Sequence, residues 1–190
     1  VLWGIFMITH IIPPHGGYKA LLSFQKSEIV YDATVRFCAD LLDKRDRTVD
    51  QMIQAARSGK QNIVEGSQAS GTSKEMELKL TNVARASLEE LLTDYRDFLR
   101  TQGFEEWPKD HPHVKRLREL NRQPHANYAT FKKAVEHPNP AIRANAIIGL
   151  IKVTNYLLDQ QIRQLEQTFL SEGGLRERMT RARLQRRSYP

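Results

Sequence analysis

The sequence predicts an all-α protein: an antiparallel up-down four-helix bundle with short helices inserted between the third and fourth long helices. Four long segments carry apolar residues three and four positions apart, no segment alternates like a strand, and prolines and glycines gather between the segments. With 190 residues, 40% hydrophobic and 27% charged, the chain has the composition of an ordinary globular protein. Long helices joined by short turns pack as antiparallel neighbours, which favours a bundle.

Three parts are predicted along the chain: an N-terminal arm over residues 1–17, the four-helix bundle domain over 18–174, and a basic C-terminal tail over 175–190. The arm begins with about a dozen apolar residues, which are too few to span a bilayer, and it lacks the features of a signal peptide. We expect the arm to pack on the bundle or on a neighbouring subunit. No contact with a membrane is expected.

The apolar stripes place the helices. The first is expected over about 18–42, with Leu22, Ile29, Val30, Ala33, Phe37, Cys38 and Leu41 inward and Tyr31 and Val35 widening the stripe. The third, over about 73–101, carries Met76, Leu80, Val83, Ala84, Ser87, Leu88, Leu91, Tyr95, Phe98 and Leu99. Short helices are expected over 114–121 and 126–136. The last long helix, over 140–171, carries Ala144, Ile147, Ile148, Ile151, Thr154, Leu158, Ile162, Leu165 and Phe169.

The second helix, over about 49–65, has small residues such as Ala56 and Gly59 on its inner stripe. A glycine inside a helix costs about 1 kcal/mol relative to alanine, so we expect another helix to approach closely there. Thr48 with Gln51, and Thr72 with Glu75, read as capping boxes that start the second and third helices. Gly66 is expected to end the second helix in the left-handed conformation.

Residue patterns for catalysis or metal binding are not found in the sequence. No Glu-x-x-His pair, phosphate-binding glycine loop or nucleophile elbow occurs, and the six histidines fall in the arm, in loops or at helix ends. His111 and His113 are interpreted as part of a solvated loop rather than as ligands. The single cysteine, Cys38, is expected to be a small buried hydrophobic residue. We therefore predict no cofactor, no metal and no enzymatic activity, in a reducing cytoplasmic compartment.

Polar residues also mark the two central helices. Asn62 and Glu65, with Ser87 and Glu90, are expected to hydrogen-bond across the helical hairpin or to cap backbone groups near Gly66. A ligand site is the alternative. An enzyme would need a pocket that gathers Glu65, Glu90 and a histidine.

The basic character of the chain is concentrated in the tail, which contributes +5 of the formal net charge of +7. Its charge comes from six arginines and one acid, Glu177: Arg176, Arg178, Arg181, Arg183, Arg186 and Arg187. Three interpretations stay open: a solvated and partly disordered terminus, binding to the phosphate backbone of nucleic acid, and, least favoured, an anionic membrane surface.

Two runs in the central hairpin, QAARSGKQNIVEG over 54–66 and TSKEMELKLTNVARASLEELLTDY over 72–95, resemble the bacterial four-helix bundle proteins. This family includes proteins encoded in intervening sequences of large-subunit ribosomal RNA genes. The shared pattern is Gln54, Arg57-Ser58, Asn62-Ile63-Val64-Glu65-Gly66, Ser73-Lys74-Glu75 and Ala84-Arg85-Ala86-Ser87-Leu88-Glu89-Glu90-Leu91. The resemblance covers about residues 16–102. The segment over 104–139, the long N-terminus and the arginine tail depart from it and resemble a longer "suffix domain" branch.

The resemblance implies a homo-oligomer, commonly a pentamer, without established catalysis. A relative, the accessory protein of diversity-generating retroelements, implies contact with nucleic acid and a reverse transcriptase. We therefore predict a non-enzymatic oligomeric helical module that binds RNA, DNA or a nucleoprotein partner. The six tail arginines are the expected phosphate contacts, with Arg57 and Lys60 secondary. The alternative is a structural or protein-interaction scaffold whose basic tail is incidental.

Overall fold

The computed structural model describes residues 12–187, and its regular elements are all helical. They are η1 (Tyr18–Ala20), α1 (Leu22–Leu41), α2 (Arg47–Ala69), α3 (Lys74–Thr101), α4 (Pro112–Arg122), α5 (Tyr128–Val135), α6 (Pro140–Glu172) and α7 (Leu175–Arg187). No strand occurs within residues 12–187, so the predicted all-α class is confirmed. The expected packing of the arm falls mostly on residues 1–11, which lie outside the described residues.

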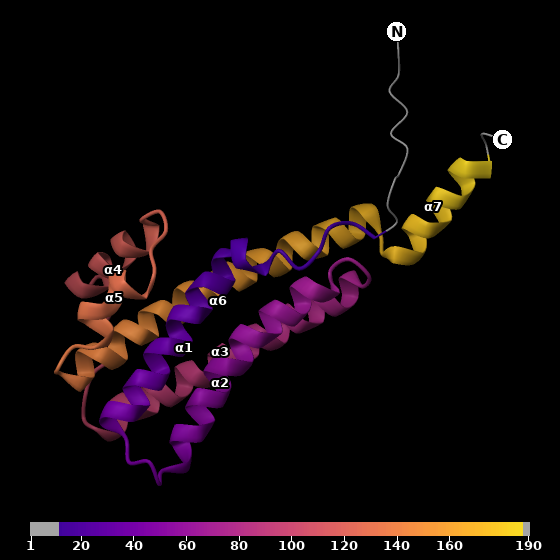
Figure 1. Ribbon diagram of the computed structural model, residues 1–190. Helices are drawn as coiled ribbons and strands as arrows, with labels where there is room; N and C mark the ends of the chain where they lie inside the picture. The colour runs from indigo at the N-terminus through magenta and orange to yellow at the C-terminus, as the bar shows by residue number, and fades with distance from the viewer. Residues whose placement is uncertain (1–11, 188–190) are drawn as a thin grey trace.

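The four long helices pack in the order α1, α2, α3, α6, and α6 also contacts α1. Successive long helices run in opposite directions, and the short helices α4 and α5 lie beside the first part of α6 (Figure 1). The described part of the arm reaches the far end of α2, where the Gly16 N–H donates a hydrogen bond to the Ser67 carbonyl at 3.0 Å. Helix α7 continues beyond this end of the long helices (Figure 1).

The core lies between the four long helices and under α5. Phe37 stands edge-on to Tyr95 and Phe98, with ring centroids 5.0 and 4.9 Å away. Cys38 is 1% exposed, as expected for a small buried hydrophobic residue, and burial raises the pKa of its thiol to about 11. Dispersion and apolar burial at such positions are the main stabilising terms of the fold.

Some residues expected in the apolar stripes are exposed, and for them the prediction is wrong. Met76 and Val83 of α3 are 45% and 40% exposed. The rest of the buried face of α3 agrees with the predicted stripe at Ala84, Leu88, Leu91, Tyr95 and Leu99, and Leu92 is added to it. Leu22, Val35 and Phe169 are also exposed. Helical periodicity identifies an apolar stripe, but the neighbouring helices decide how much of its width is covered.

Both predicted capping boxes are wrong by one or two residues. Helix α2 starts earlier because the Asp46 carboxylate accepts a hydrogen bond from the Thr48 N–H at 2.8 Å, so that Asp46 is the N-cap. Helix α3 is capped by Ser73, whose hydroxyl accepts from the Met76 N–H at 3.1 Å. Asp, Ser and Thr are all good N-caps, so local chemistry alone does not choose between adjacent candidates.

The prediction that Gly66 ends the second helix is also wrong. Helix α2 continues to Ala69, and Gly66 is buried inside it against α3. A Cβ on Gly66 would lie 3.3 Å from the Glu77 carbonyl oxygen and 3.4 Å from the Leu80 Cβ. The glycine therefore serves close approach rather than a left-handed turn. The close approach expected at Gly59 is confirmed, since a Cβ there would meet the Leu88 side chain at 2.7 Å.

Candidate nucleic-acid interface

The basic segment forms a helix, α7, rather than an unstructured tail. Gly173, with φ of 72°, ends α6, and the Glu177 carboxylate accepts a hydrogen bond from the Gly174 N–H at 2.9 Å. Backbone N–H groups at Glu177 itself and at Gly174 lower the pKa of that carboxyl. An acid in the first turn also suits the positive end of the helix dipole. The chain thus folds locally so that α7 starts immediately after α6.

Two of the six tail arginines hold α7 in place. The Arg178 guanidinium is half-buried and donates a hydrogen bond to the Gly71 carbonyl, in the turn between α2 and α3, at 3.2 Å. The Arg181 guanidinium donates to the Glu172 carbonyl at the end of α6. These contacts use the two side chains within the molecule, so neither is fully available to a phosphate group.

The other four arginines, Arg176, Arg183, Arg186 and Arg187, are exposed, and no ion pair joins them to another described residue. Arg183 lies seven residues after Arg176 and Arg187 four residues after Arg183, which places these three on one helix face. Arg178 and Arg181 lie on the opposite side. The predicted set of six therefore divides into four outward cations and two that contact the body.

The secondary residues Arg57 and Lys60 lie elsewhere. Arg57 is exposed in the middle of α2, roughly 18 Å along the helix from its end near α7. The Lys60 ammonium sits 4.2 Å from the centroid of the Tyr31 ring on α1, a cation–π contact. The structure does not bring these two residues to the arginines of α7.

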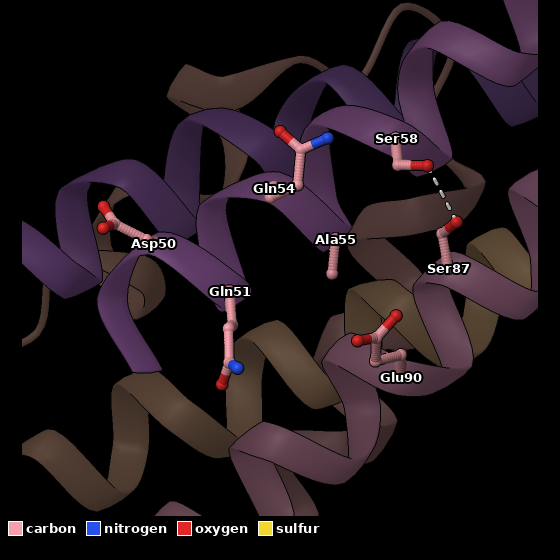
Figure 2. Close-up of a pocket in the computed structure, with 7 residues that line it drawn as sticks. All are labelled: Asp50, Gln51, Gln54, Ala55, Ser58, Ser87 and Glu90. Atoms are coloured by element: carbon pink, nitrogen blue, oxygen red, sulfur yellow. Dashed lines mark hydrogen bonds between the residues drawn. The ribbon is translucent and has the colours of Figure 1, made fainter. Parts of the chain in front are cut away.

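A second feature, absent from the sequence expectations, is a groove between α2 and α3 with a volume of about 380 Å³. It is lined by Asp50, Gln51, Gln54, Ala55, Ser58, Ser87 and Glu90. Figure 2 shows the α2 side chains on one side, Ser87 and Glu90 of α3 on the other, and the small Ala55 between them. The Ser58 and Ser87 hydroxyls, 2.9 Å apart, join the two helices at one end of the groove (Figure 2).

The polar motif residues have different roles from one another. Ser87 bonds across the hairpin as expected, but its partner is Ser58. The Asn62 amide donates to the Ser58 carbonyl and hydroxyl, at 2.9 and 3.1 Å, within its own helix. Glu65 and Glu90 are exposed and form no hydrogen bond with a described residue. Cross-hairpin bonding is therefore confirmed for Ser87 alone, and no residue of the set caps the backbone at Gly66.

The rim of the groove is acidic. Asp50 and Glu90 line it, and Asp94 and Asp97 follow Glu90 one and two turns further along α3. Burial, and then the charges of Glu90 and Asp97, raise the pKa of the Asp94 carboxyl. Among the described residues no cation forms an ion pair with Asp50, Glu90 or Asp94. The four acids could have been recognised from their spacing, but not the groove beside them.

The structure also locates residues considered for metal binding and catalysis. His111 stacks on Trp107 with ring centroids 4.6 Å apart, and His113 packs beside both rings. Within residues 12–187 no three His, Cys, Asp or Glu side chains are grouped to hold a metal ion. The groove contains Glu90 but neither Glu65 nor a histidine. No helix in the described part of the chain is long and apolar enough to cross a membrane.

Comparisons with protein-family models, with curated proteins and with solved structures find no match to this chain. The resemblance to the bacterial four-helix bundle proteins therefore stays a prediction from the quoted sequence runs.

Proposed function

We propose that the protein is a non-enzymatic, oligomeric helical module of the cytoplasm that binds the phosphate backbone of nucleic acid through α7. In this proposal the long helices α1, α2, α3 and α6 form the antiparallel four-helix bundle, with α4 and α5 as the inserted helices. The supporting observation is the division of the tail arginines. Arg178 and Arg181 fix the helix, while Arg176, Arg183, Arg186 and Arg187 face solvent.

Clustered arginines bind phosphates by releasing condensed counterions, so affinity falls as salt rises. Six phosphate contacts imply a slope of log K against log salt of about −4 to −5, the value expected from the sequence. Four contacts imply about −3 to −4. The structure therefore favours the smaller slope. Binding through the backbone also implies little dependence on base sequence.

The test is fluorescence anisotropy of the full chain with labelled single-stranded RNA and duplex DNA over a range of salt. The variant R183A/R187A removes two outward cations and is expected to weaken binding at low salt and to reduce the slope by about 1.5 to 2. The control K115A/R118A removes two exposed cations of α4 and leaves binding unchanged. A flat salt dependence, or unchanged binding by a chain truncated after Gly174, contradicts the proposal.

The acidic groove favours a second candidate, a protein-interaction scaffold. The groove has small side chains at its base and exposed carboxylates at its edge. These suit a basic protein segment better than nucleic acid, which is negatively charged like the carboxylates. The readout is a pull-down with residues 1–174. Recovery of a protein partner without nucleic acid supports the scaffold. If neither a protein nor nucleic acid is recovered, the scaffold hypothesis is contradicted.

A further inference from the structure

The base of the groove has small side chains, which would let another helix approach it closely. Ala55, Ser58 and Ser87 have small side chains, and Val83, one turn from Ser87 on α3, is 40% exposed beside them. A narrow, partly apolar floor between two antiparallel helices is the shape that receives a third helix. The α2–α3 face is thus an unpartnered helical surface within the described residues.

The charge of the rim indicates which helix fits. Asp50, Glu90 and Asp94 have no ion-pair partner among the described residues. Asp50 and Glu90 line the same groove and Asp94 follows Glu90 by one turn, and carboxylates gathered in this way without cations favour a cationic occupant. The outward face of α7, with the exposed Arg176, Arg183 and Arg187, is a cationic helix surface of this kind.

The spacings of the two charge rows agree. Glu90 and Asp94 lie four residues apart on α3, and Arg183 and Arg187 lie four residues apart on α7. Each pair is therefore separated by about 6 Å along its helix axis. Two helices packed side by side can place both arginines opposite both acids, and guanidinium–carboxylate pairs of this kind favour two-point contact.

The helix α7 of the same molecule does not occupy this groove. Arg178 holds α7 at Gly71, whereas the groove begins near Ser58, roughly 17 Å back along α2, and extends to Asp50. Figure 1 shows α7 pointing away from the long helices. An occupant with the charge of α7 must therefore come from another molecule.

We propose that α7 of one copy docks into the α2–α3 groove of a second copy, with Arg183 and Arg187 against Glu90, Asp94 and Asp50. The two surfaces differ, so the contact is head-to-tail and builds a ring or a filament rather than a two-fold dimer. This inference rests on the oligomeric part of the proposed function and does not require nucleic-acid binding. Because phosphates and the groove use the same arginines, nucleic acid competes with assembly.

Sedimentation velocity of the full chain over a micromolar to sub-millimolar range tests the contact by charge reversal. Wild type is expected to self-associate in low salt. The variants R183E/R187E and D50R/E90R should each weaken association about tenfold or more, because like charges then face each other. Combining all four substitutions in one chain should restore it. The control E28R/E166R makes the same charge change as D50R/E90R at exposed sites on α1 and α6 and leaves association unchanged.

Several outcomes overturn the inference. They are a monomer at every concentration, association that persists after truncation at Gly174, and failure of the fourfold variant to recover. Circular dichroism melting of each variant shows that the fold is kept. D50R/E90R retains every α7 arginine, so its nucleic-acid binding separates the two proposals. We expect this variant to lose self-association but to keep nucleic-acid binding. If it loses nucleic-acid binding and still self-associates, both proposals are contradicted.

Discussion

The contact between α2 and α3 and the contact between α1 and α6 are built from different kinds of residue. Helix α2 meets α3 through Gly59, Gly66 and a pair of serine hydroxyls, so the two backbones come close. Helix α1 meets α6 through longer polar side chains. The Ser23 hydroxyl donates to the Gln161 side-chain oxygen at 2.8 Å, and Arg143 donates twice to one Asp40 oxygen, at 3.0 and 3.1 Å.

The two contacts are expected to differ in which substitutions destabilise them. A close backbone approach has no free volume, so any added side-chain atom must displace a neighbour. The contact of a buried arginine with a partly exposed carboxylate depends instead on keeping the two partners together. Arg143 is 4% exposed and also lies 5.8 Å from the centroid of the Phe37 ring, and Asp40 also pairs with Arg36. We therefore expect the first contact to be sensitive to size and the second to the loss of charge.

The largest decrease in the free energy of unfolding is expected for G59V. The first side-chain atom already meets the Cγ and Cδ2 of Leu88 at 2.7 Å, and Leu88 is fully buried, so either the Leu88 side chain or the two helices must shift. Overpacking of this kind costs about 1 to 3 kcal/mol, and valine adds a further steric load. Urea unfolding followed by circular dichroism measures the change. G66A serves as a comparison, because its contacts of 3.3 Å and more are looser. Equal or greater stability of G59V would show that the helices are not held close.

A smaller decrease in the free energy of unfolding, about 2 kcal/mol, is expected for R143M. Methionine keeps the apolar stem of the arginine, but Asp40 is then left with Arg36 as its only cation. The matched control is R85M, which removes the ion pair from α3 to Asp159 of α6. Both side chains of that pair are about 40% exposed, so we expect less than about 1 kcal/mol. Similar losses in the same urea experiment contradict the distinction between an ion pair with a buried arginine and an exposed ion pair.

The smallest effect, and the one stabilising change, is expected for D94N. Burial raises the pKa of Asp94 above its ordinary value of 3.8, so the folded protein holds this proton more tightly than the unfolded chain. The stabilisation is present below the unfolded pKa and is lost as pH rises through the folded pKa. At neutral pH the variant should therefore be more stable, by about 0.5 kcal/mol or less because solvent screens the site. Melting curves from pH 3 to 7 measure the gain, which should vanish at the acidic end.

Local signals predicted some elements closely. The last long helix was expected over 140–171 and spans Pro140–Glu172, because Asn139 caps it, Pro140 suits its first turn and Gly173 ends it. Gly66 shows where such signals stop. A glycine permits both a left-handed helix end and a close approach, and only the position of α3 decides between them.

The candidate interface was predictable in composition but not in arrangement. The helical segments, the stripes from which the core is drawn and the positive charge after Gly174 could be predicted, since they depend on residue type and spacing along one chain. The packed structure was needed to show that Arg178 and Arg181 bond to carbonyl groups while Arg183 and Arg187 face solvent. The same holds for the position of Glu90 beside a groove. These features depend on the rotation of each helix against its neighbours, and packing between distant segments sets that rotation.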